Sequence, residues 1–93
     1  MSRPYKSVWD AIEATRADAA NMKARATLML AVRKAIDVWD LTQVTAAKRL
    51  GISQPRLNDF LNGRIDKFSL DALVNLAAQA GLAVTIRTVR KAA

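Results

Sequence analysis

The chain has no cysteine and no histidine among its 93 residues. Their absence excludes disulfide bonds, zinc sites built on thiolate or imidazole ligands, haem ligation through histidine, cysteine nucleophiles and Ser-His-Asp relays. No pair of carboxylates has the spacing of a catalytic acid and base, and no glycine-rich phosphate loop is present. The sequence therefore predicts a binding protein of the cytoplasm without cofactor or metal, rather than an enzyme.

Glycine, proline and aromatic residues are also scarce, with three glycines, two prolines and an aromatic fraction of 5%. Alanine, in contrast, occupies 18 positions. Because alanine is the strongest helix former and buries little surface, this composition predicts a helical domain with a modest core. No apolar run is long enough for a signal peptide or a membrane span, so we expect no membrane partner.

The charge is strongly positive but unevenly distributed, with a formal net value of +7. Residues 1–40 carry seven basic and five acidic side chains, whereas residues 41–93 carry eight and three. Residues 7–20 contain three acidic side chains and one arginine. A solvated surface explains many such patterns, but the asymmetry also indicates an anionic partner for the basic part and a different partner for the N-terminal part.

Helical spacing of Val8, Trp9 and Ile12 predicts that residues 7–20 form a short helix or a segment that becomes helical on contact with a partner. Asn21 is a suitable cap for a longer helix that ends near residue 38. Arg33 lies on the solvated side of this second helix. Its apolar stripe, which we expect in the core, consists of Met22, Leu28, Met29, Val32, Ile36 and Trp39.

Three further helices are predicted, each preceded by a residue that favours the N-cap position. They cover residues 43–50 after Thr42, 54–61 after Ser53, and 69–80 beginning at Ser69. Gly51 suits the left-handed position that ends the first of them.

The last segment changes period, because Leu82, Val84 and Ile86 alternate with smaller or polar residues. This pattern predicts a β-strand, and its unpaired edge needs a partner. The same strand of a second subunit, paired across a two-fold axis, is the economical solution. The expected organisation is an arm at residues 1–20, a body at 21–81 and a dimerisation strand with a basic tail at 82–93.

Residues 41–63 carry the pattern that indicates function. Ala47 is small where two helices would cross, and Gly51 permits a tight turn four residues later. Leu57 and Phe60 would fix the second helix to the core, while Ser53 leaves its N-terminus exposed. This arrangement is typical of a helix-turn-helix whose second helix enters the major groove of DNA.

The run Leu-Thr-Gln … Ala-Ala … Leu-Gly-Ile-Ser-Gln … Asn-Gly over residues 41–63 resembles the helix-turn-helix of Cro/lambda-repressor-like (XRE) regulators. Residues 7–12, 53–56, 66–73 and 81–82 are similar to HigA-like antitoxins of type II toxin–antitoxin modules. The resemblance implies a mainly all-α, lambda-repressor-like fold of four to five helices and a homodimer on a palindromic operator in double-stranded DNA. It also implies autorepression and a RelE/HigB-like ribonuclease toxin as partner. A stand-alone XRE-family regulator shares the domain and is the alternative.

Carried over by position, the resemblance implies two sets of DNA contacts. The residues expected to contact bases are Gln54, Pro55, Arg56, Asn58 and Asp59. Those expected to contact phosphates are Gln43, Ser53, Asn62, Arg64 and Lys67. Arginine can pair with guanine and glutamine with adenine, whereas Asp59 would accept from cytosine or hold Arg56 one helical turn away. Lys48 and Arg49 are expected on a solvated face.

Val8, Trp9 and Ile12 are assigned to partner binding, with Trp9 as the anchor that a toxin buries. Packing of Trp9 on the helices of the dimer itself is the other interpretation. A protein-interaction module that uses the helix-turn-helix only as scaffold is a second class of function, in which Arg56→Ala would leave function intact.

Overall fold

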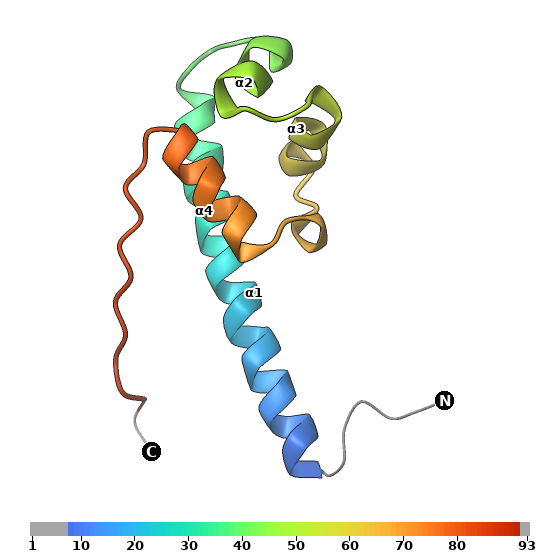
Figure 1. The fold of residues 1–93 in the computed structure, drawn as a ribbon, viewed down its shortest axis with the longest axis vertical. Helices are drawn as coiled ribbons and strands as arrows, with labels where there is room; N and C mark the ends of the chain where they lie inside the picture. The colour runs from blue at the N-terminus through green and yellow to red at the C-terminus, as the bar shows by residue number, and fades with distance from the viewer. Residues whose placement is uncertain (1–7, 92–93) are drawn as a thin grey trace.

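The computed structural model describes residues 8–91, which form four α-helices and one turn of 3-10 helix. The helices are α1 (Val8–Asp37), α2 (Gln43–Leu50), α3 (Gln54–Leu61) and α4 (Leu70–Gln79), and η1 (Ile65–Lys67) precedes α4. In Figure 1, α4 lies along the C-terminal half of α1, and α2 and α3 form a unit at one end. The segment that follows α4, up to residue 91, runs back beside α1. The predicted mainly all-α fold is confirmed. Within residues 8–91, no helix is long and apolar enough to cross a membrane.

The three predicted N-caps are confirmed, and each uses the same local geometry. The hydroxyl of Thr42 accepts a hydrogen bond from the Thr45 amide at 3.3 Å, and that of Ser53 accepts from the Arg56 amide at 3.2 Å. Ser69 accepts from the amide three residues ahead at 3.1 Å. Since each cap satisfies an amide that lacks a partner inside its helix, the starts of α2, α3 and α4 follow from local sequence.

The predicted break at Asn21 is wrong, because α1 continues through this position for 30 residues. Asn21 does not cap a helix; its side-chain oxygen instead accepts a hydrogen bond from Arg25 Nε at 2.6 Å. No glycine or proline interrupts residues 8–37, so nothing in the backbone favours a stop. The expected boundary between residues 20 and 21 therefore falls inside one helix, and residues 1–7 of the expected arm lie outside the described residues.

The core forms where α2, α3 and α4 meet the C-terminal part of α1. Its largest fully buried side chains are Phe60, Phe68, Leu57, Leu73 and Val32. The rings of Phe60 and Phe68 meet edge to face, with centroids 5.6 Å apart. From α1 only Met29, Val32 and Ile36 are buried, so the N-terminal half of this long helix projects from the body (Figure 1).

The predicted C-terminal strand does not form within the described residues. After the Leu82 amide closes the end of α4 by donating to Ala77 O at 2.9 Å, residues 83–91 contain no helix or strand. A strand requires a neighbour for its amide and carbonyl groups, and residues 8–91 offer none. Val84 and Ile86 remain exposed. The pairing of Leu82, Val84 and Ile86 across a dimer is therefore unsupported, and residues 92–93 of the expected tail lie outside the described residues.

Candidate nucleic-acid interface

The turn between α2 and α3 exposes the N-terminus of α3. Gly51 has a left-handed backbone with φ of 72°, and its amide donates to Lys48 O at 3.1 Å. The following amide, of Ile52, donates to Ala47 O at 3.0 Å, which closes the end of α2. Ala47 and Leu57 are buried where the two helices pack together. The turn that the spacing of residues 47–57 predicts is confirmed.

The outward face of α3 carries the residues expected to contact bases. Gln54, Pro55 and Asn58 are exposed along the first two turns, so their polar atoms and the proline ring are available to a ligand. Arg56 and Asp59 are only half-exposed, because each contacts the loop that follows α3. All five residues thus lie on one helix, but three are freely exposed and two are engaged in contacts with the loop.

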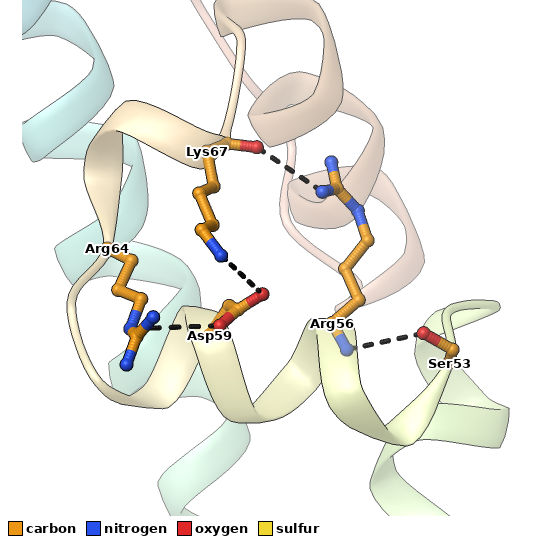
Figure 2. A network of polar contacts seen from close by, with 5 residues as sticks. All are labelled: Ser53, Arg56, Asp59, Arg64 and Lys67. Carbon is orange, nitrogen blue, oxygen red and sulfur yellow. Dashed lines mark hydrogen bonds and ion pairs between the residues drawn. The ribbon is translucent and has the colours of Figure 1, made fainter.

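Arg56 is attached to the loop before α4. Its guanidinium donates to Lys67 O at 3.3 Å and lies over the ring of Phe68, 4.3 Å from the centroid. Figure 2 shows this side chain reaching away from its own helix toward Lys67. The cation–π contact and the hydrogen bond together connect α3 to the segment at residues 64–69.

Asp59 also contacts the loop. One interpretation of the sequence paired it with Arg56, but its partners are two other cations. Its two carboxylate oxygens pair with Arg64 Nε at 3.7 Å and with Lys67 Nζ at 3.6 Å (Figure 2). Such exposed ion pairs stabilise a fold by about 0–1 kcal/mol. Their main effect is therefore on the orientation of the two cations.

The residues expected to contact phosphates surround α3. Gln43 begins α2, Ser53 caps α3 at one end, and Asn62 follows it at the other. Arg64 directly precedes η1 and Lys67 is its last residue, and all five residues are exposed. The Ser53 hydroxyl accepts a hydrogen bond from the Arg56 amide, so its own proton is available to a phosphate oxygen. Polar groups thus lie at both ends of the helix that carries the base-facing residues.

Comparison with known proteins identifies this arrangement. A family model described as a helix-turn-helix domain matches residues 12–89. A solved structure named "Putative XRE Family Transcriptional Regulator" is 32% identical to the chain, with a TM-score of 0.73 over 80% of this chain and 83% of that one. The chain belongs to the XRE family of helix-turn-helix proteins. No curated protein sequence matches it.

Sequence reasoning missed two arginines that hold the DNA-binding unit of this XRE protein on α1. Arg33 donates from its guanidinium to Leu61 O at 2.8 Å, and Arg25 donates to Ile65 O at 3.0 Å. They anchor the end of α3 and the start of η1 to one helix. Because Arg25 and Arg33 lie about two turns apart on α1, their common face was visible in the sequence, but their carbonyl partners were not.

Trp39 and Arg49 also form a contact that the sequence did not predict. The indole of Trp39 packs against the core, as predicted, and the guanidinium of Arg49 lies 4.2 Å from the centroid of its ring. Arg49 therefore covers an aromatic surface between α1 and α2, in addition to facing solvent.

Proposed function

We propose that this XRE-family protein is a transcriptional repressor that binds a palindromic operator in double-stranded DNA as a homodimer. The family assigns it to the DNA-binding helix-turn-helix proteins. The observation that carries the sequence-specific function is the exposed start of α3, with Gln54 and Asn58 on its surface and the cations of Arg64 and Lys67 beside it. A helix presented in this way can place side chains on base edges while the flanking groups bind phosphates.

The proposed contacts differ in how far each side chain must move. Gln54 and Asn58 reach base edges from their exposed positions, and the ring of Pro55 fits against a thymine methyl. Arg56 reaches a guanine only after leaving Lys67 O and the Phe68 ring. Asp59 accepts from a cytosine amine only after leaving Arg64 and Lys67, which then bind phosphates with Gln43, Ser53 and Asn62.

A gel-shift titration with DNA from upstream of the gene tests this proposal. We expect Asn58→Ala to weaken binding to the operator by ~1–3 kcal/mol and to leave binding to unrelated DNA nearly unchanged. Asn75→Ala is the matched control, because Asn75 is an exposed asparagine on α4. Equal affinity of the unaltered protein for operator and unrelated DNA would contradict the proposal, as would an equal loss for both variants.

We also propose that the protein is an antitoxin whose α1 binds a RelE/HigB-like toxin. Val8 and Trp9 are 74% and 73% exposed, and Ile12 lies beside them on the part of α1 that projects from the body. An exposed tryptophan with two aliphatic neighbours is a suitable anchor for a protein partner, and the adjacent Glu13 suits a basic one. A stand-alone regulator shares every DNA-binding feature but needs no such partner.

Co-expression with the product of the neighbouring gene separates these two functions. If that product inhibits growth, we expect this protein to restore growth and Trp9→Ala to lose most of the rescue. Val38→Ala removes an equally exposed apolar side chain just beyond the other end of α1 and should rescue fully. A neighbouring product that has no effect on growth would leave the stand-alone regulator as the function.

A further inference from the structure

A groove of about 770 Å³ runs between the middle of α1, the start of α4 and the C-terminal segment. Its apolar surface includes Leu28 of α1, Leu70 and Val74 of α4, and Val84 and Ile86 of the C-terminal segment. In Figure 1 this segment runs beside α1, on the side of the molecule away from α3. The groove is thus separate from the proposed DNA contacts, and its lining side chains expose a large apolar surface that a partner can cover.

The charges around this groove restrict what can occupy it. Arg16 and Lys23 of α1 line it on one side, and Arg87 and Lys91 of the C-terminal segment line it on the other. No carboxylate is among its lining residues. A complementary occupant therefore combines apolar side chains with at least one acidic group.

The N-terminal edge of α1 has this composition, in a chain that is otherwise strongly basic. We define the α1 edge as Val8, Trp9, Ile12 and Glu13, all of which are exposed. Val8 and Trp9 are 74% and 73% exposed and Ile12 is 37% exposed, in the half of α1 that contributes no buried residue to the core. We propose that the groove binds the α1 edge of a second copy of this chain.

The spacing along α1 supports a symmetric exchange. Ile12, Arg16, Ala19 and Lys23 follow one another at intervals of three or four residues, so the α1 edge and the floor of the groove share one face of the helix. Two α1 helices that meet antiparallel through this face place each edge in the groove of the other copy. Such a contact is self-complementary and closes as a two-fold dimer.

The residues near the centre of this face fit the crossing point. Ala19 and Ala20 line the groove there, and their small side chains permit a close approach of the two helices. With the crossing point at Ala19, Trp9 lies ten positions before it and Leu28 nine positions after it, so Trp9 of one copy comes level with Leu28 of the other. Glu13 likewise comes near Lys23 of the second copy. The exchange buries the exposed tryptophan and pairs a groove cation.

This interface deepens the proposed function, because it assigns a surface to the proposed homodimer in place of the unsupported strand pairing. It also has a consequence for the proposed toxin. The α1 edge cannot lie in the groove and in a toxin at the same time, so toxin binding and dimer formation compete.

A charge-swap experiment without DNA or toxin tests the proposal. In sedimentation velocity, we expect Glu13→Lys and Lys23→Glu each to raise the dimer dissociation constant about fivefold, and the double variant to recover most of the loss. Asp18→Lys changes a carboxylate on the opposite face of α1 and should match the unaltered protein. An unchanged dissociation constant in both single variants would overturn the proposed interface, as would an equal effect of Asp18→Lys.

Disulfide formation provides an independent readout, because the chain has no cysteine of its own. We expect Ala19→Cys to form a cross-linked dimer under mild oxidation and Asp18→Cys to stay uncross-linked. A dimer that persists while Ala19→Cys fails to cross-link would overturn this interface and leave the proposed homodimer intact. A monomer at all concentrations would overturn both, while operator binding in a gel shift would still report on DNA recognition.

Discussion

At the scale of single residues, Arg56 and Asp59 of α3 have partners in the loop that follows their helix. Arg56 contacts Lys67 O and the Phe68 ring, and Asp59 pairs with Arg64 and Lys67. In the proposed complex, two of the five base contacts therefore require that an internal partner is exchanged for DNA. Breaking the internal contacts costs the same free energy on any DNA. Only a base sequence that forms good contacts with Arg56 and Asp59 offsets this cost, so such a sequence is preferred.

Asp59→Asn tests the role of the carboxylate at this scale. Without the ion pairs, Arg64 and Lys67 are available to any phosphate, so we expect tighter binding to unrelated DNA and a lower preference for the operator. Each additional phosphate contact steepens the salt dependence of the binding constant by about one unit in log–log slope. The free energy of unfolding should change by less than about 1 kcal/mol.

The control is Asp66→Asn, which removes the same charge from the exposed side of η1. Binding titrations at several salt concentrations compare the two variants. If Asp66→Asn lowers the preference for the operator as much as Asp59→Asn does, net charge explains the effect and the ion pairs do not.

At the scale of elements, the DNA-binding unit depends on the tight turn between α2 and α3. Gly51 has a left-handed backbone, with φ of 72°. A β-carbon added there would be 3.8 Å from the nearest side-chain atom, in Gln79, which is an ordinary contact. The glycine is therefore needed for its backbone conformation and not for space.

We expect Gly51→Ala to lower the free energy of unfolding by ~1–2 kcal/mol, since that is the cost of a left-handed conformation for an L-residue. Asparagine tolerates this conformation better, so Gly51→Asn should be less destabilising. Urea denaturation followed by circular dichroism measures both values. Equal costs for alanine and asparagine would show that backbone strain is not the cause.

At the scale of the whole molecule, α1 belongs to two regions. Its C-terminal half contributes Met29, Val32 and Ile36 to the core and holds the loop after α3 through Arg25 and Arg33. Its N-terminal half projects from the body and presents the α1 edge. One helix thus connects the DNA-binding unit to the surface proposed for a second copy or a toxin.

Hydrogen exchange tests this division. An isolated stretch of helix is marginal in water, so amides of residues 9–20 should exchange much faster than those of residues 29–36 in dilute protein. Raising the protein concentration through the dimer dissociation constant should slow exchange in residues 9–20. Uniform protection along α1 at the lowest concentration would contradict the two-region description.

The local part of the fold and of the candidate site could be predicted from the sequence. Thr42, Ser53 and Ser69 cap the helices that follow them, and Gly51 makes the turn of the helix-turn-helix. The face of α3 that carries Gln54 and Asn58 also follows from the pattern, because Leu57 and Phe60 bury the opposite side. All of these features depend on residues a few positions apart.

The features that the sequence did not predict depend on distant partners. Asn21 can cap a helix or bond to Arg25 within one, and the uninterrupted backbone favours the second. Arg56 and Asp59 are half-exposed only because η1 folds back against α3. Residues 82–86 alternate like a strand, but the described residues form none, because a strand exists only where another chain segment satisfies its hydrogen bonds.

By itself, the sequence determined α2, α3 and α4, their caps and the helix-turn-helix, since backbone preferences act over a few neighbouring residues. Only the tertiary structure decided that α1 is one helix with a projecting half and that two cations are held by Asp59. It also decided that a groove lies between α1, α4 and the C-terminal segment. These outcomes required long-range packing, because each depends on which surfaces meet once the helices are assembled.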